Sequence, residues 1–154
     1  MLTLLDTIAK LNAALAGKVR SITAYDEALA LYNSLDYGKA LPLMTEAADM
    51  GNTQAMSLLG SMYLLGQGVK EDGRLAVQWL RRALEGGYEE AGSVLGMAYA
   101  TGKADVQRDL PAARALLEIA ASRGDAQSAR MLEMMDKGEG MFAATRKGKR
   151  GHCR

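Results

Sequence analysis

The sequence has little of what disulfide scaffolds, membrane spans and many active sites are built from. Among 154 residues there are one cysteine, one histidine, one tryptophan and two prolines, and aromatic residues make up 5%. A single cysteine, Cys153, excludes an intramolecular disulfide framework. No apolar run approaches the length needed to span a bilayer. No run of alternating β-branched residues predicts a strand.

What the sequence does contain favours helices. It is 49% hydrophobic and 24% charged, an ordinary composition for a globular chain. Ala, Leu, Met and Gly are plentiful, and alanine and leucine are strong helix formers. We therefore predict an all-α fold in one compact unit, which at this length can bury a core without cross-links.

One glycine-containing motif occurs twice in the sequence. GSMYLLGQGVKED at 60–72 returns as GMAYATGKADVQRD at 96–109. The preceding and following segments repeat as well, with matched alanines 36 and 37 residues apart. Each segment carries apolar residues at i, i+3, i+4 and i+7, the mark of an amphipathic helix. The copies are 40–47, 76–83 and 113–120 for one helix, and 55–63, 91–99 and 128–135 for the other.

The residues between these helices agree with the period. Gly51, Gly87 and Gly124 stand at the same phase, where glycine ends a helix in a left-handed conformation. We expect four N-caps, at Asn52, Asp72, Asp109 and Asp125. Pro111 falls in a first turn, where proline is tolerated. Pro42 falls several residues into its helix, which leaves a kink or a later helix start open.

Gly60 and Gly96 lie inside predicted helices, where glycine costs about 1 kcal/mol against alanine. Because this cost recurs at equivalent positions of two repeats, we predict a close contact between helices at each glycine, which a side chain would block. The repeated motif is therefore interpreted as a site of close helix packing followed by a loop. A catalytic loop is normally needed once, whereas a structural unit is needed many times.

A period of 34–40 residues built from two helices indicates a helical-pair solenoid. The motifs that carry a resemblance are Leu59-Gly60-x-x-Tyr63, the Gly-x-Gly-Val loop at 66–69 that runs to Asp72, and the helix with Ala76, Trp79 and Ala83. On these motifs residues 21–138 resemble Sel1-like repeats, relatives of the tetratricopeptide repeat. The resemblance implies a right-handed α-solenoid of antiparallel helix pairs, with about seven or eight helices.

The chain departs from the repeat pattern at both ends. The first pair, 23–34 with 37–50, has the short connection SLDYG, typical of a tetratricopeptide repeat. In the last helix Glu133 and Asp136 replace the core Gly and Tyr, which suits a terminal helix with no neighbour to cover it.

Residues 1–20 form a separate predicted segment. Leu4, Ile8, Leu11 and Leu15 share one helix face; Thr3 and Asp6 can cap its start, and Gly17 can end it. We predict an amphipathic helix docked on the repeats. A membrane-surface helix and an atypical signal sequence are the alternatives, although no basic residue precedes the apolar part. The predicted compartment is the cytoplasm, or the periplasm if the segment is such a signal.

Candidate chemistry is sparse. His152 and Cys153 are adjacent in a glycine-rich tail, and a nucleophile and base need a pocket and an orienting third group. Two residues are also fewer than the three or four protein ligands of a typical zinc site. The pairs Glu71-Asp72 and Glu89-Glu90 lie at helix starts, where they complement the dipole. Arg81, Arg82 and Arg130 are assigned to solvated helix faces. We predict no enzyme activity, no cofactor and no metal.

Residues 139–154 are predicted to be a disordered tail. Residues 140–154 hold five basic and no acidic side chains against a whole-chain net charge of +1, so the rest of the chain is net acidic. The tail could attract RNA, DNA or anionic lipid, but it lacks interleaved aromatic residues for base stacking. Nucleic-acid binding through the tail, and an enzyme or enzyme subunit, remain the alternative functions.

The predicted function is a bacterial protein–protein interaction module, because helical-pair solenoids present a curved surface to another polypeptide. The resemblance to Sel1-like repeats implies adaptor or scaffold roles, with a toxin or a secretion or signalling component among the partners, and it leaves open a role as an immunity protein. In the related tetratricopeptide superhelix the first helix of each pair lines the concave face. The predicted partner-binding residues are Gln54, Ser57, Ser61, Glu90, Ser93, Met97, Gln127, Arg130 and Met134.

Overall fold

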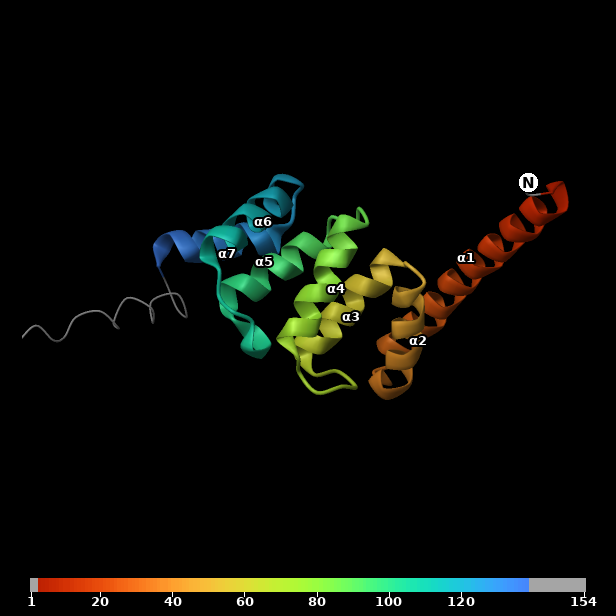
Figure 1. Cartoon of the computed structure of the whole chain (residues 1–154). Coiled ribbons are helices and arrows are strands. Elements are labelled where there is room, and N and C mark those ends of the chain that lie inside the picture. The colour runs from red at the N-terminus through yellow and green to blue at the C-terminus, as the bar shows by residue number, and fades with distance from the viewer. Residues whose placement is uncertain (1–2, 139–154) are drawn as a thin grey trace, which may run out of the picture.

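The computed structural model describes residues 3–138, and within them the fold is entirely helical. Seven α-helices follow one another in antiparallel pairs, α1 with α2, α3 with α4, and α5 with α6, and α7 closes the row (Figure 1). The chain forms the right-handed α-solenoid predicted from the repeat period. The helices are α1 (Leu4–Asn33), α2 (Tyr37–Asp49), α3 (Thr53–Leu65), α4 (Gly73–Glu85), α5 (Ala91–Thr101), α6 (Leu110–Ser122) and α7 (Ala126–Lys137), with a 3₁₀ turn, η1 (Lys103–Asp105).

The core is made of the repeated small and apolar residues. The paired alanines that open and close each second helix, in α2, α4 and α6, are between 0% and 8% exposed. Met44, Leu80 and Leu117 fill the space between them and are fully buried. Small side chains let the two helices of a pair approach closely, so the alanine period predicted from the sequence is the period of the helix contacts.

The second helices α2, α4 and α6 end in the same way. Gly51, Gly87 and Gly124 have φ of +92°, +93° and +95°. The residue after each glycine donates its backbone N–H to the carbonyl of the second repeated alanine, at 3.0 Å from Asn52 to Ala47 in the first copy. This is a Schellman motif. The predicted N-caps also form: Asn52, Asp72, Asp109 and Asp125 each accept a backbone N–H of the following helix.

Gly60 and Gly96 are close-packing positions, as predicted. A Cβ atom on Gly60 would lie 2.7 Å from Cγ of Leu80 and 3.1 Å from the carbonyl oxygen of Ala76. A Cβ atom on Gly96 would lie 3.0 Å from Cγ of Leu117. Both contacts join the two helices of one pair, so the glycines set how closely each pair can close.

The two repeated loops reach their second helix by different means. Gly68 has φ of +71°, and a Cβ atom there would lie 2.5 Å from the carbonyl oxygen of Tyr37. At the matching place 36 residues on, Ala104 takes φ of +55°, and the extra residue Asp105 takes +60°. The second loop therefore holds two non-glycine residues in the left-handed region, which costs free energy.

Pro42 lies inside α2, which begins at Tyr37, so the later helix start left open by the sequence does not occur. The predicted end of the N-terminal helix at Gly17 is wrong. One helix, α1, runs without interruption from Leu4 to Asn33, and a Cβ atom on Gly17 would meet nothing within 4 Å. Thr3 and Asp6 form the predicted capping box at its start.

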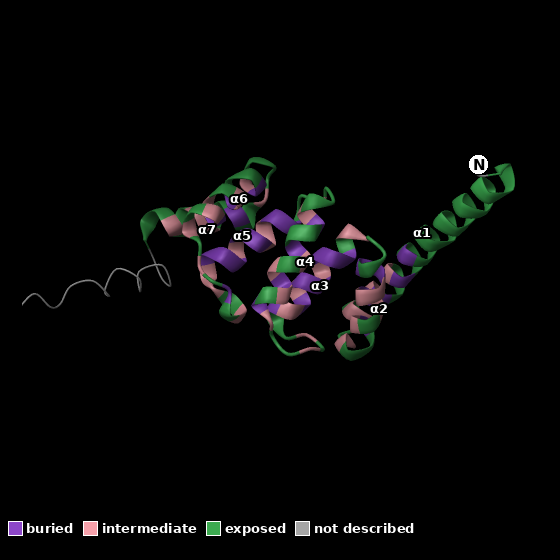
Figure 2. Ribbon diagram, viewed as in Figure 1, coloured by how far each residue is buried: buried purple, intermediate pink, exposed green. Residues whose placement is uncertain are grey.

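The N-terminal half of α1 does not dock on the repeats, which corrects the prediction for residues 1–20. Residues 3–20 are exposed, whereas the C-terminal half packs on α2 through Ser21, Ala24 and Ala28. Figure 1 shows the exposed half projecting away from the row of helices, and Figure 2 shows the change from exposed to buried along α1. The helix continues because nothing in its sequence stops it: glycine disfavours a helix interior by only about 1 kcal/mol.

Replacing Gly96 with Leu should destabilise the protein by several kcal/mol, because the added side chain would enter the contact with Leu117. Gly17→Leu is the matched control, since that position is open and helical. Chemical denaturation of both variants checks this. Equal unfolding free energies would refute the close-contact role of Gly96.

Replacing Ala104 with Gly should stabilise the protein by about 1 kcal/mol, because glycine adopts a positive φ without steric cost. Ala115→Gly, at an exposed position inside α6, should instead destabilise by about 1 kcal/mol. Thermal unfolding distinguishes the two. A loss of stability in Ala104→Gly would show that the left-handed residues of this loop carry no strain.

Candidate functional site

The first helices of successive pairs face one another along one side of the solenoid. Helix α3 contacts α5, and α5 contacts α7, whereas the second helices approach one another less. Stacked helix pairs of this kind make a concave surface on the side where neighbouring helices are closest. The row therefore bends toward α3, α5 and α7.

Two adjoining hollows of about 380 and 370 Å³ run along this side. Met97 and Gln127 line both, so the hollows form one continuous depression, which we call the trough. It crosses three helices from Ser61 and Leu65 of α3 to Arg130 and Met134 of α7. Its surface is mostly apolar, with charged residues toward its ends.

The charged residues of the trough differ in how they are held. Lys103 pairs with Glu71 at 2.8 Å, and Lys137 pairs with Glu133 at 2.7 Å. Arg130 makes no ion pair with any residue between 3 and 138 and is exposed. Its guanidinium is therefore available to an incoming carboxylate, and Arg is well suited to bidentate contacts.

Methionine supplies much of the adaptable surface. Met97 lies at the middle of the trough and Met134, 41% exposed, lies at the α7 end. Methionine is unbranched and polarisable, so it can change rotamer to fit different apolar side chains. A half-exposed methionine between polar residues fits an adaptable contact surface better than it fits a core.

The structure divides the predicted partner-binding residues into groups. Ser61, Met97, Gln127, Arg130 and Met134 line the trough. The remaining four, Gln54, Ser57, Glu90 and Ser93, lie outside the trough. Whether any of them binds a partner stays a prediction.

Glu90 and Ser93 line a separate hollow of about 260 Å³ beside Arg123 and Asp125, and Arg123 there pairs with Glu89. Gln54 lines a groove between α1 and α3. Ser57 is only 7% exposed, so it belongs to the buried residues of α3 and not to an open face. It lies one position from the buried Met56, and its short side chain fits between helices.

Sequence reasoning missed the last turn of the trough. Leu65, Thr101 and Lys137 line it, one turn beyond Ser61, Met97 and Met134 on the same helix faces. Leu65 is 55% exposed at the end of an otherwise buried helix. Extending the predicted face by three or four residues in each helix would have found all three.

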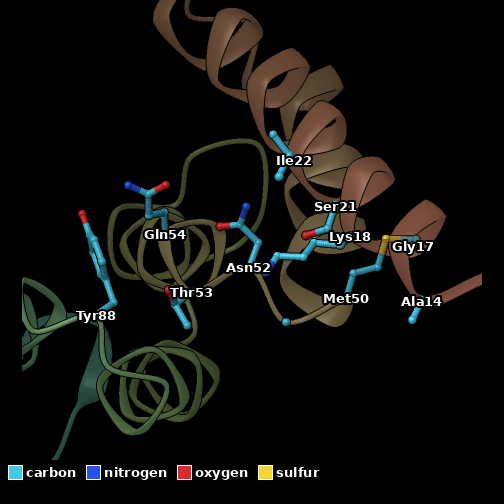
Figure 3. Close-up of a pocket in the computed structure, with 11 residues that line it drawn as sticks. Ala14, Gly17, Lys18, Ser21, Ile22, Met50, Asn52, Thr53, Gln54 and Tyr88 are labelled. Carbon is cyan, nitrogen blue, oxygen red and sulfur yellow. The ribbon is translucent and has the colours of Figure 1, made fainter. Parts of the chain in front are cut away.

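A groove of about 670 Å³ lies between α1 and α3 (Figure 3). Ala14, Lys18 and Ile22 of α1 line one wall, and Thr53 and Gln54 of α3 line the other. Met50 lies between them at the end of α2. The first pair thus leaves an open space where the later pairs form the trough.

Helix α7 is positioned by its N-cap. The carboxylate of Asp125 accepts the backbone N–H of Ser128 at 3.1 Å and that of Gln127 at 3.4 Å. The Ser128 hydroxyl donates to the same carboxylate and lowers the pKa of Asp125 below its usual value. Ser128 is fully buried, so this cap also anchors the helix that carries Arg130 and Met134.

Other predicted candidates have structural partners. Both Nε and a terminal nitrogen of Arg81 donate to the Tyr99 hydroxyl, and Arg82 stacks over Trp79 at 4.4 Å, so neither is a simple solvated arginine. Between residues 3 and 138 no group of three or more His, Cys, Asp or Glu residues could hold a metal ion. His152, Cys153 and the basic tail lie outside the described residues.

No helix among residues 3–138 combines the length and the apolar character that a membrane crossing requires. Within this part of the chain, the fold and its trough define a class: a tetratricopeptide-related solenoid of helix pairs with a groove along its first helices.

The comparison with protein families narrows this class. The Sel1 repeat model matches residues 32–52, 53–88 and 93–125, more than half of the chain. The chain belongs to the Sel1 repeat family. Its repeats are protein–protein interaction modules, and the family consists in general of non-catalytic scaffolds.

Solved structures agree with this assignment. A Sel1 repeat protein from Oxalobacter formigenes superposes with a TM-score of 0.62 at 27% identity, over 84% of this chain and 98% of that one. A protective antigen from uropathogenic Escherichia coli with an SLR fold gives a TM-score of 0.68 at 33% identity, over 79% of this chain and 27% of that one. The cysteine-rich protein B of Helicobacter pylori shares the fold, with a TM-score of 0.57 at 20% identity, over 84% and 97%.

A curated relative matches over a shorter stretch. An uncharacterized protein of Neisseria meningitidis serogroup B is 44% identical over 54 residues, which is 32% of this chain. The chain spans 12% of the length of that relative. The similarity is therefore that of a repeat segment, and it carries no function of the longer protein to this one.

The Asp125 cap predicts a local effect on the trough. Asp125→Ala should destabilise α7 by about 1 kcal/mol, and Asp125→Asn should retain most of the cap. Hydrogen exchange of the α7 amides is the measurement. Uniform protection in all three proteins would show that the cap does not hold α7.

The same cap predicts a pH dependence. Because the folded pKa of Asp125 is lowered, its contribution is present above the unfolded value of about 3.9 and is lost as pH falls through the lower folded value. Asp125→Asn should remove this dependence, since its amide does not titrate. An unchanged acid limb in the variant would contradict the assignment.

Proposed function

We propose that the chain is a bacterial adaptor or scaffold that holds a segment of another protein in the trough. The observation that carries the proposal is the continuity of the trough across α3, α5 and α7, with Met97 and Gln127 common to both of its hollows. A surface shared by three successive first helices suits one extended segment better than several separate contacts.

The trough also indicates the chemistry of the segment. Apolar residues such as Leu65, Val94 and Met97 suit apolar side chains of the partner. The exposed guanidinium of Arg130, which makes no ion pair within residues 3–138, favours an acidic residue at the α7 end. The proposed ligand is therefore a peptide or loop with apolar residues followed by an acidic one.

The first experiment identifies which side of the solenoid contacts the partner. A photo-crosslinking residue replaces Met97 in the trough and, in a matched variant, Gln78, which is exposed on the second helix α4. The proposal expects a crosslinked protein from Met97 and none from Gln78. Crosslinking from Gln78 alone would move the interface to the other side of the solenoid.

The second experiment tests charge. Arg130→Glu should weaken capture of the crosslinked partner by roughly tenfold or more, the loss expected at an energetically important interface residue. Arg74→Glu, at an exposed position of α4, is the matched control and should leave affinity unchanged. Melting curves establish that both variants are folded.

Glu90→Lys distinguishes the trough from the separate hollow that Glu90 lines. If Glu90→Lys weakens capture while Arg130→Glu does not, the partner sits in the hollow beside Asp125, and the trough is excluded as its site.

Within this proposal, neutralisation of a cognate secreted toxin is one specialisation that the resemblance to the family leaves open. An immunity protein acts by covering a toxin surface, which a groove without catalytic residues can do. Its test is growth on co-expression of a toxin encoded beside this chain. Rescue by the wild type and loss of rescue by Arg130→Glu would support it, and equal rescue by both would contradict a trough-mediated mechanism.

A further inference from the structure

The exposed half of α1 carries an apolar surface that no described residue covers. Within residues 4–22 seven large apolar side chains are between 46% and 77% exposed: Leu4, Leu5, Ile8, Leu11, Leu15, Val19 and Ile22. Scattered exposed leucines are normal, but a contiguous apolar surface of this kind marks an interaction site.

The spacing of these residues specifies what can cover them. Leu4 and Leu11 are seven residues apart, and so are Ile8, Leu15 and Ile22, with alternating steps of four and three between the two sets, which is a heptad pattern. This is the seam of a two-helix coiled coil, with Leu5 and Val19 on one flank. A lipid surface fits less well, because the opposite face is not rich in free Lys and Arg: it holds Asp6 and Lys10, and its Arg20 is paired with Glu46.

We propose that this seam is a self-association surface, on which α1 of a second copy packs antiparallel. One register covers all seven of these α1 side chains. It pairs Ile22 with Leu4 of the second copy, Leu15 with Leu11 and Lys18 with Ile8, each pair occurring twice by symmetry. On the flanks Leu5 meets Val19, and Ala14 meets Ala14.

Charge and space select the antiparallel arrangement. Lys18 is the only charged residue of the seam. In a parallel pair Lys18 would face Lys18 of the second copy, and like charges at a shared layer repel. In the antiparallel pair Lys18 faces Ile8, so its methylene stem packs on an apolar side chain while its ammonium stays in water. The two solenoids then lie at opposite ends, since each begins packing at Ser21.

The groove between α1 and α3 receives the end of the second helix. Ala14, Lys18 and Ile22 line it from the seam side of α1, and Met50, 47% exposed, lies at its rim (Figure 3). In the proposed register the first turns of the second α1, with Leu4 and Ile8, arrive at these residues. A volume of about 670 Å³ accommodates several side chains.

The buried area fits a specific but modest dimer. Fourteen partly exposed apolar side chains would remove roughly 1,000 Å² of apolar surface from water, near the lower end of specific interfaces. The surface lies outside the trough, so the inference goes beyond the proposed function, and its tests need no partner.

The first test measures the oligomeric state of the full chain by sedimentation equilibrium over the micromolar range. The wild type should dimerise; Leu11→Glu, at the centre of the seam, should raise the dissociation constant at least tenfold. Ala13→Glu places the same charge on the opposite face and should dimerise like the wild type. Circular dichroism checks that all three are equally helical. A monomeric wild type, or equal effects of the two variants, overturns the proposal.

The second test reads the orientation. In a Cys153→Ser background, Ala14→Cys should form an intermolecular disulfide under mild oxidation, because Ala14 lies next to its own copy only in the antiparallel register. Lys18→Cys should not, since only a parallel pair brings that position together. The reverse result overturns the antiparallel arrangement. A wild-type monomer that binds anionic phospholipid vesicles, and loses this binding in Leu11→Glu, would assign the surface to lipid instead.

Discussion

The solenoid depends on how closely two helices of one pair can approach. Gly60 and Gly96 let Leu80 and Leu117 lie within about 3 Å of where a Cβ atom would stand. The flanking alanines of the second helices have small side chains, so the two helices stay equally close along the rest of the contact. Because dispersion and burial fall off steeply with distance, this close approach gives helices of 11–13 residues enough contact to be stable. The curvature, and with it the trough, follows from repeating one such contact.

Much of the fold could be predicted because the helix ends of each repeat are determined by residues that are close in sequence. The caps at Asn52, Asp72, Asp109 and Asp125 and the glycines at 51, 87 and 124 depend on nearest neighbours, so their sequence signals are sufficient. The end of α1 could not be predicted in this way. Gly17 is compatible with a helix end and a helix interior, and no packing contact around Gly17 decides between them.

The candidate site was predicted less completely, for a related reason. A face of a helix is set by its period, so five of the nine residues fall in one trough. Burial, however, depends on what packs above the position. Ser57 is covered at 7% exposure although its phase matches that of Ser61. Glu90 is the N-cap of α5, where the backbone hydrogen bonds join residues three apart and the α-helical phase is shifted. Helix period locates a surface, and only the neighbouring helices show which of its positions are open.

The position of α7 has a consequence for recognition. Among residues 3–138, helix α7 packs mainly on α6 and α5, whereas a central helix such as α4 packs between two neighbours, so opening of α7 should cost less free energy than opening of the central pairs. Helix α7 contributes Gln127, Arg130 and Met134 to the trough, so a ligand there binds the docked state of α7. Its apparent affinity is the intrinsic affinity scaled by the docked fraction. Substitutions in the small interface between α6 and α7, such as the Arg114–Asp136 pair at 2.6 Å, can therefore tune binding without touching the ligand.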